Sequence, residues 1–122
     1  MAKYGYKILV IEDDIQIQKL FEISLIEQNF LVKICHTNKE AFNNFDIFNP
    51  DLVILDLGLP DGDGKQFIKQ MRKNNIKIPI IVVSARNNED EIVESLNVGA
   101  DDYIVKPFYT KELIARISSA LR

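Results

Sequence analysis

Cysteine is almost absent from this sequence: Cys35 is the only one in 122 residues. A single thiol cannot form an intrachain disulfide, and it cannot supply the set of thiolates that a thiolate-based metal site needs. Because Cys35 follows a Val-Lys-Ile stretch, we expect it to be an ordinary residue of a β-strand.

Long apolar runs are also missing. The two longest aliphatic runs span residues 8–11 and 78–83, and Pro79 interrupts the second. A membrane-spanning helix needs roughly 20 apolar residues. The N-terminal stretch Met-Ala-Lys-Tyr-Gly-Tyr-Lys has no apolar segment of the kind found in secretory signals. The sequence therefore predicts a soluble, cytoplasmic chain.

Positive charge is in deficit, with 15 lysines and arginines against 18 aspartates and glutamates and a net charge of −3. We therefore expect no direct binding to nucleic acid or to an anionic membrane surface. Hydrophobic residues make up 47% and charged residues 27% of the chain, as in an ordinary soluble domain of this length. A disordered tail and a collagen-like fibre are excluded.

Short aliphatic runs alternate with longer amphipathic segments five times along the chain. The runs are rich in Ile and Val without polar alternation, which is typical of strands buried on both faces of a parallel sheet. The predicted strands span residues 7–11, 31–35, 52–55, 78–83 and 103–105, and the predicted helices span 15–28, 38–48, 65–74, 90–97 and 110–121. This pattern predicts one α/β domain, a doubly wound parallel sheet with strand order 2-1-3-4-5.

Local signals support several of these limits. Thr37 and Glu40 have the spacing of a capping box, which predicts the start of the second helix. Gly99 stands where the fourth helix should end, and Pro79 stands at the entry to the fourth strand. Thr110 suits the start of the last helix.

Polar residues follow four of the predicted strands. The first strand is followed by Glu12-Asp13-Asp14 and the third by Asp56, while Ser84 follows the fourth and Lys106 the fifth. In a doubly wound sheet, ligands bind at the carboxyl ends of the strands, beside the switch point between the first and third. We therefore expect these side chains to meet there.

The carboxylates of Glu12, Asp13 and Asp56 would raise one another's pKa values unless a cation lay between them. Oxygen ligands suit a hard divalent ion, and Mg²⁺ is expected because it accepts few protein ligands. Asp13 and Asp56 would bind it directly with the carbonyl of Gly58, and Glu12 through water. Lys106 would leave the site positive enough to accept a phosphoryl group.

Each residue also has an ordinary structural role when it is taken alone. Asp56 could form a turn or a cap, residues 12–14 could cap the first helix, and Ser84 could be a turn residue. Their joint placement at four strand ends favours the functional interpretation.

Four segments carry a resemblance to a known family. They are Ile8–Asp14, Pro50–Gly64, Val83–Arg86 and Gly99–Phe108. Together they resemble the bacterial response-regulator receiver domain, which has a CheY-like, flavodoxin-like (βα)5 fold, over residues 7–121. Within that family the chain is most similar to the OmpR/PhoB class of transcription regulators, and its runs 57–64 and 84–86 are similar to the Kdp-type regulators.

The resemblance implies a signalling domain rather than an enzyme. Asp56 is then the acceptor of a phosphoryl group from a sensor histidine kinase, with Mg²⁺ at Glu12 and Asp13. Lys106 and Ser84 contact the phosphoryl oxygens, and a cis Lys106-Pro107 peptide is expected. Ser84 moves toward the phosphoryl group, and the switch residue Tyr103 turns inward to fill the space.

The resemblance also implies a homodimer through the fourth helix, fifth strand and fifth helix. Asp102, Glu112 and Arg116 match residues that pair across this dimer. The usual basic partner of Glu112 is replaced by Ile92, so one ion pair is expected to be missing or replaced by an apolar contact. For Asp102 and Arg116 the structural alternative is a solvated charged face.

Two further expectations concern the lifetime of the phosphorylated Asp56 and the domain organisation of the protein. Gly58 and Arg86 offer no obvious group to position a hydrolytic water, so the Asp56 phosphate should be lost over minutes or longer. Relatives in the class continue into a winged-helix DNA-binding domain, so residues 1–122 are either a single-domain regulator or the receiver of a longer protein.

Three other functions fit an α/β fold but lack their motifs here. A haloacid-dehalogenase-type phosphatase needs a second Asp two residues after the nucleophile, where this chain has Gly58. An FMN protein needs a Ser/Thr-rich loop after the first strand, where residues 12–14 would repel a phosphate in the absence of a metal ion. A dinucleotide fingerprint fails because Phe67 stands where its third glycine belongs.

Overall fold

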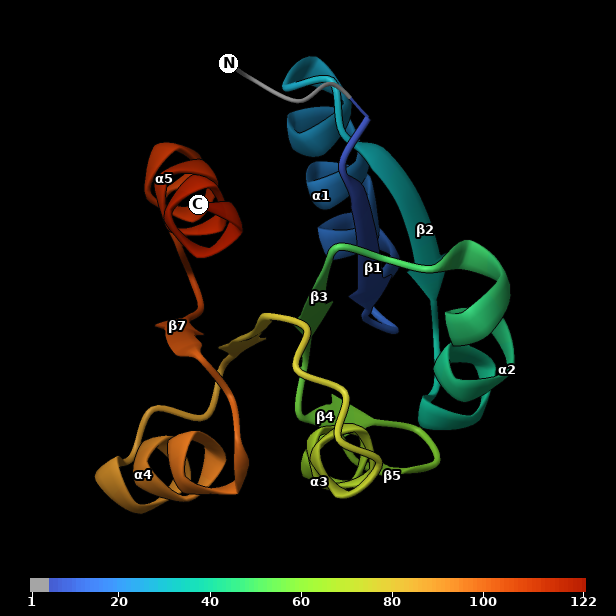
Figure 1. Ribbon diagram of the computed structural model, residues 1–122. Helices are drawn as coiled ribbons and strands as arrows, with labels where there is room; N and C mark the ends of the chain where they lie inside the picture. The colour runs from blue at the N-terminus through green and yellow to red at the C-terminus, as the bar shows by residue number, and fades with distance from the viewer. Residues whose placement is uncertain (1–4) are drawn as a thin grey trace.

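The computed structural model describes residues 5–122, and a five-stranded parallel sheet lies at its centre (Figure 1). The strands are β1 (Lys7–Ile11), β2 (Leu31–Cys35), β3 (Leu52–Leu55), β6 (Ile80–Ser84) and β7 (Asp102–Val105). Their order in space is β2-β1-β3-β6-β7, which confirms the predicted fold class and the order 2-1-3-4-5.

Helices cover both faces of the sheet. They are α1 (Ile15–Glu27), α2 (Asn38–Phe48), α3 (Lys65–Lys73), α4 (Glu89–Val98) and α5 (Thr110–Leu121). Helices α1 and α5 lie on one face, and α2, α3 and α4 lie on the other (Figure 1). Within residues 5–122, no helix has the length and apolar character that would let it cross a membrane.

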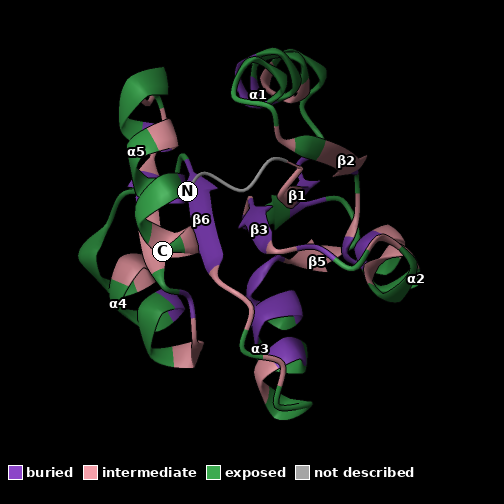
Figure 2. Cartoon of the chain, turned by 45° about the horizontal axis from the view of Figure 1, so that its top comes forward, coloured by how far each residue is buried: buried purple, intermediate pink, exposed green. Residues whose placement is uncertain are grey.

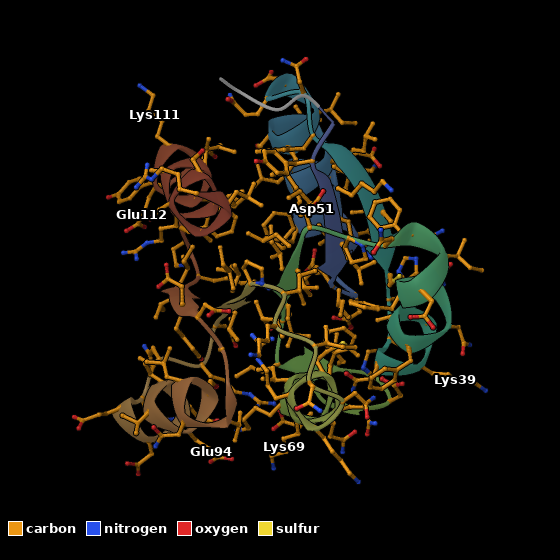
Figure 3. The ribbon with its side chains drawn as sticks, viewed as in Figure 1. Lys39, Asp51, Lys69, Glu94, Lys111 and Glu112 are labelled. Carbon is orange, nitrogen blue, oxygen red and sulfur yellow. The ribbon has the colours of Figure 1, made fainter. Side chains whose placement is uncertain are left out.

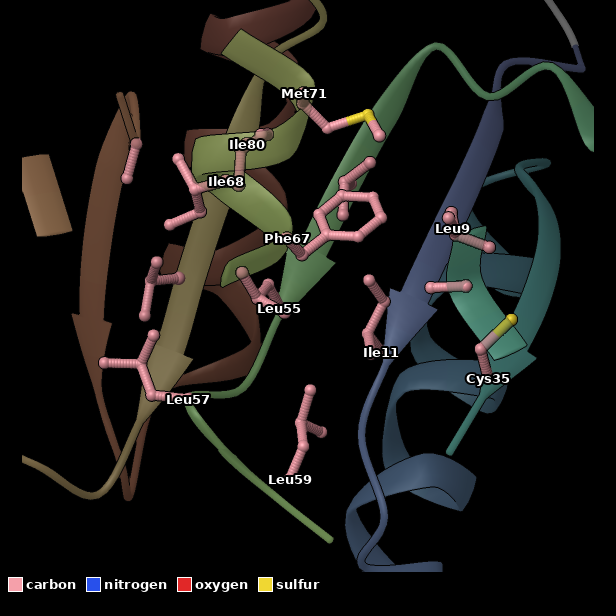
Figure 4. Close-up of a cluster of buried hydrophobic side chains, with 14 residues drawn as sticks. Leu9, Ile11, Cys35, Leu55, Leu57, Leu59, Phe67, Ile68, Met71 and Ile80 are labelled. Atoms are coloured by element: carbon pink, nitrogen blue, oxygen red, sulfur yellow. The ribbon is translucent and has the colours of Figure 1, made fainter. Parts of the chain in front are cut away.

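The core is divided into two layers by the sheet. Leu9 and Ile11 of β1 belong to the layer beneath α2 and α3, which also contains Phe67 (Figure 4). Ile8 and Val10 of the same strand belong to the layer beneath α1 and α5. Because successive side chains of a strand point to opposite faces, a strand covered on both faces is apolar throughout. The purple colour of β3 and β6 in Figure 2 shows this.

Two element ends have the caps that the sequence indicated, and the last helix begins at the expected residue without a side-chain cap. The Thr37 hydroxyl accepts a hydrogen bond from the backbone N–H of Glu40 at 3.0 Å and caps α2. In a complete capping box the Glu40 carboxylate would accept a hydrogen bond from the backbone N–H of Thr37. Here it accepts from the N–H of the preceding residue, His36, at 3.4 Å. Gly99, with φ 128°, ends α4, and Thr110 is the first residue of α5.

The fourth strand begins two residues later than expected, at Ile80, and includes Ser84. Pro79 has no N–H to contribute to a ladder, and the carbonyl of Ile78 accepts instead from the Arg72 guanidinium at 2.8 Å. At the other end, the N–H of Lys106 donates to the carbonyl of Ser84 at 2.8 Å. Ser84 is therefore the last residue of β6, not the residue after it.

A short antiparallel hairpin, β4 (Gly58–Leu59) and β5 (Gly62–Asp63), follows β3. Strands of two residues leave no hydrophobic period in the sequence, so sequence analysis did not predict them.

Candidate functional site

The carboxyl edge of the sheet brings three of the predicted acidic residues together. Strands β1 and β3 pair with Ile11 opposite Leu55, and the N–H of Asp56 continues this pairing by donating to the carbonyl of Ile11 at 2.9 Å. The residues that follow the two strands are therefore neighbours. One carboxylate oxygen from each of Glu12, Asp13 and Asp56 lies within 4.8 Å of the others.

Lys106 reaches the same edge from the end of β7. Its Nζ lies 2.6 Å from Oε1 of Glu12 and 3.1 Å from Oδ2 of Asp56. The Lys106-Pro107 peptide is cis, as expected from the sequence. Lys106 thus bonds two of the three clustered carboxylates and compensates part of their negative charge.

Burial and ion pairing together shift the pKa values of Glu12 and Lys106. The Glu12 side chain is 1% exposed, and this burial raises the pKa of its carboxyl, with the charge of Asp56 adding to the effect and the Lys106 hydrogen bond opposing it. Burial would lower the pKa of Lys106, but its bonds to Glu12 and Asp56 outweigh that effect and raise it. Lys106 is therefore a firmly protonated cation at neutral pH.

The donor set fits a hard divalent cation. The three clustered side chains offer carboxylate oxygens, and Asp13 is exposed while Asp56 is half-buried. Oxygen donors with a solvent-accessible side are what Mg²⁺ prefers, because it keeps several waters. Gly58, the predicted backbone ligand, lies two residues after Asp56, and its N–H donates to Asp56 Oδ1 at 3.4 Å.

Gly64 supports the loop that carries Asp56, and sequence analysis assigned it no role. A Cβ on Gly64 would clash with the backbone carbonyl oxygen of Asp56, so no larger residue fits there without a shift of the backbone. The N–H of Gly64 donates to the carbonyl of Leu57 at 2.8 Å. The Gly62-Asp63-Gly64 run indicates a tight loop in the sequence. That Gly64 lies against the backbone of Asp56 is visible only in the folded chain.

The two predicted switch residues both bond to Arg86. Ser84 is 1% exposed, and its hydroxyl accepts from the N–H of Arg86 at 3.2 Å. Tyr103 packs against the core layer beneath α2 and α3, and its hydroxyl donates to the carbonyl of Arg86 at 2.5 Å. The ring of Tyr103 is thus half-buried while Asp56 is unmodified. Sequence analysis assigned Arg86 no such contacts.

The residues predicted at a dimer face are paired within one chain. Arg116 on α5 lies 3.1 Å from Asp102 of β7 and 3.2 Å from Glu112. Ile92 of α4 is half-buried, and Val93 beside it is exposed. These contacts neither require nor exclude a second copy.

Comparison with protein families gives a match to the model described as the response regulator receiver domain, over residues 8–118. Among curated proteins, the chain is 44% identical to the transcriptional regulatory protein KdpE of Staphylococcus aureus, over 91% of this chain and 48% of that protein. It is 40% identical to the transcriptional regulatory protein PmrA of Pectobacterium parmentieri, over 95% of this chain and 52% of that protein. The chain spans about half the length of these relatives.

Solved structures agree with the sequence comparison. The receiver domain of the Francisella response regulator 1452 superposes with a TM-score of 0.90 at 32% identity, covering 96% of this chain and 97% of that one. The BeF3-activated N-terminal receiver domain of Klebsiella pneumoniae RstA gives a TM-score of 0.90 at 30% identity, covering 95% of this chain and 98% of that one.

Proposed function

Because this chain belongs to the response regulator receiver domain family, we propose that Asp56 accepts a phosphoryl group from the phosphohistidine of a sensor histidine kinase. The single observation that carries this proposal is the position of Lys106 Nζ, 3.1 Å from Oδ2 of Asp56 and 2.6 Å from Glu12. A cation at that point can contact an oxygen of a phosphoryl group carried by Asp56.

The transfer is an in-line displacement. An oxygen of the Asp56 carboxylate attacks the phosphorus, the bond from phosphorus to the histidine nitrogen breaks, and its electron pair stays on the departing imidazole. Lys106 donates to the phosphoryl oxygens, which develop charge during transfer. Receiver domains generally bind Mg²⁺ at an acidic site; here Asp13, Asp56 and the Gly58 carbonyl would hold it, with Glu12 acting through water. Bound Mg²⁺ supplies charge neutralisation.

The phosphoryl group then alters the face formed by α4, β7 and α5. Ser84 moves toward the phosphoryl group and donates a hydrogen bond from its hydroxyl to the new oxygens, and Tyr103 turns inward to fill the space behind it. That face forms a homodimer in which Asp102, Glu112 and Arg116 take part. In the full-length protein, dimerisation controls a C-terminal DNA-binding domain and transcription in the cytoplasm.

The phosphoryl group should persist for minutes or longer. Gly58 has no side chain, and Arg86 is bonded to Asp63 and Glu91, so neither residue is available to position a hydrolytic water near Asp56.

Intact mass after incubation with acetyl phosphate and Mg²⁺ tests the acceptor role. We expect one added phosphoryl group on the parent, none on Asp56→Asn, and none after EDTA. Asp46→Asn is the matched control, because Asp46 is an exposed aspartate of α2, and it should be modified like the parent. Equal modification of the parent and Asp56→Asn, or no adduct on the parent under any condition, would remove the proposed function.

A further inference from the structure

Five charged side chains form a second cluster, away from Asp56. They come from β5, α3, the loop after β6, and α4, and we call them the charge cluster: Asp63, Lys65, Arg86, Glu91 and Glu94. Helices α3 and α4 lie side by side at this point, as Figure 3 shows with Lys69 labelled on α3 and Glu94 on α4. Three carboxylates thus share two cations.

Lys65 is at the centre of the cluster. Its side chain is only 9% exposed, and its Nζ lies 2.5 Å from Glu91, 3.4 Å from Glu94 and 3.6 Å from Asp63. Buried lysines are rare unless they are paired. Removing one partner of a buried pair is costly because the other charge remains without compensation. These contacts therefore differ from ordinary surface ion pairs, which contribute little.

Arg86 joins the cluster to the loop between β6 and α4. Its Nη1 donates to Asp63 at 2.9 Å and to Glu91 at 3.2 Å. The two carboxylate oxygens of Glu91 are therefore divided between Arg86 and Lys65. The neighbouring loop residues Ala85 and Asn87 are exposed, and the Arg86 guanidinium ties this loop to β5 through Asp63 and to α4 through Glu91.

The backbone of the same arginine bonds both predicted switch residues. Its N–H donates to Ser84 and its carbonyl accepts from Tyr103. A displacement of Arg86 must therefore change the hydrogen bonds of Ser84 and Tyr103 together.

We propose that the charge cluster positions the switch: Lys65 fixes the carboxylates of Asp63 and Glu91, these carboxylates hold Arg86, and the backbone of Arg86 holds Ser84 and Tyr103 in the arrangement described above. Lys65, Asp63 and Glu91 are positioning residues, because none of them hydrogen-bonds Ser84 or Tyr103 directly. The word switch rests on the proposed function, whereas the coupling from Lys65 to Tyr103 is a property of the unphosphorylated chain.

The test combines amide hydrogen exchange with fluorine NMR on unphosphorylated protein. Lys65→Met keeps the length of the buried stem, and Glu91→Gln keeps the shape of its partner. Glu89→Gln is the matched control, because Glu89 lies in the same first turn of α4 and is exposed. Proteins labelled with 3-fluorotyrosine report on Tyr103, and the Tyr103→Phe variant assigns its resonance.

We expect amide exchange in residues 85–99 to accelerate about fivefold in each cluster variant, as for the loss of about 1 kcal/mol of local stability. Exchange in β3 should stay at the parent rate, and the Tyr103 resonance should shift. In the double variant the two effects should be less than additive, because both changes remove the Lys65–Glu91 pair. The Glu89→Gln control should match the parent.

Two results would overturn the proposal. One is exchange in Lys65→Met and Glu91→Gln that equals the Glu89→Gln control. The other is faster exchange with an unmoved Tyr103 resonance, which would make the cluster a stabilising feature without effect on the switch. If Lys65→Met does not fold, Glu91→Gln decides between these outcomes alone. A failure of Asp56 to accept phosphate would leave all these measurements unaffected.

Discussion

At the scale of the residue, the Asp63 carboxylate accepts the backbone N–H of Lys65 at the start of α3 and also pairs with the Arg86 guanidinium. Burial alone would raise its pKa, but the backbone N–H of Lys65, which donates at 2.9 Å, and the Arg86 guanidinium outweigh burial and lower the pKa. The Asp63 side chain is 35% exposed, so solvent screens part of this interaction. A carboxyl whose pKa is lower in the folded chain stabilises the fold when it is ionised.

Because the pKa of Asp63 is lowered in the folded chain, its contribution to the free energy of unfolding should be lost in acid. The unfolded chain titrates Asp63 near pH 4, so its contribution is complete above that pH and is lost as pH falls through the lower folded pKa. Asp63→Asn should lower the free energy of unfolding at pH 7 by about 0.5–1 kcal/mol, and the difference from the parent should shrink below pH 4. Urea unfolding at pH 7 and in acid measures it. A difference of equal size at both pH values would contradict the assignment, and Asp46→Asn should differ from the parent at neither.

At the scale of the element, the last turn of α3 is joined to three other segments by Arg72. Its guanidinium donates to the carbonyls of Ile76 and Ile78 at 2.8 Å each and to the carbonyl of Gly99 at 2.8 Å, and it pairs with Asp101 at 3.0 Å. Gly99 ends α4 and Asp101 precedes β7. The planar Arg72 guanidinium therefore donates hydrogen bonds to backbone carbonyls at the end of α4 and in the loop before β6.

Replacing the Arg72 guanidinium by the ammonium group of a lysine should destabilise the fold. Arg72→Lys keeps the charge but cannot donate to all these carbonyls, so we expect a loss of about 2–3 kcal/mol from several hydrogen bonds of about 1 kcal/mol each. Urea unfolding at neutral pH is the measurement. Lys73→Gln, at the exposed neighbouring position, should change stability by less than about 0.5 kcal/mol. An Arg72→Lys variant as stable as the parent would show that water replaces the guanidinium.

Element boundaries show where local signals suffice. The start of α2 follows from the Thr37 hydroxyl and the end of α4 from Gly99. The start of β6 does not follow, because Ile78 is as apolar as the strand residues after it. Its carbonyl is removed from the ladder by Arg72, a residue of another element.

At the scale of the whole molecule, the proposed dimerisation would exchange contacts within the chain for contacts between chains. Arg116 already pairs with Asp102 and Glu112 in one protomer, so a new partner brings little net gain. Apolar side chains of α4, among them Val93 and Leu96, are exposed. We therefore expect the apolar contacts to supply the affinity and the charges to supply orientation.

Reversing the central charge tests this arrangement. Arg116→Glu places a third carboxylate beside Asp102 and Glu112, and it should weaken the dimer of the Asp56-phosphorylated chain at least about tenfold, or about 1.4 kcal/mol. Sedimentation equilibrium gives the dimer constant. Lys111→Glu, a charge reversal of the same sense on α5 (Figure 3), is the control and should have a smaller effect. Equal dimer constants for the parent and Arg116→Glu would place the interface elsewhere.

The parallel sheet, its strand order and the edge at which Glu12, Asp13, Asp56 and Lys106 meet could all be predicted from the amino-acid sequence alone. These features are predictable because apolar runs, helix caps and strand ends depend on residues close together in the sequence. Parallel strands then bring their carboxyl ends to one edge of the sheet. Only the tertiary structure decided that Gly64 lies against the backbone of Asp56 and that Arg86 bonds both Ser84 and Tyr103. Contacts between side chains of separate elements depend on packing distances, and no local pattern records those distances.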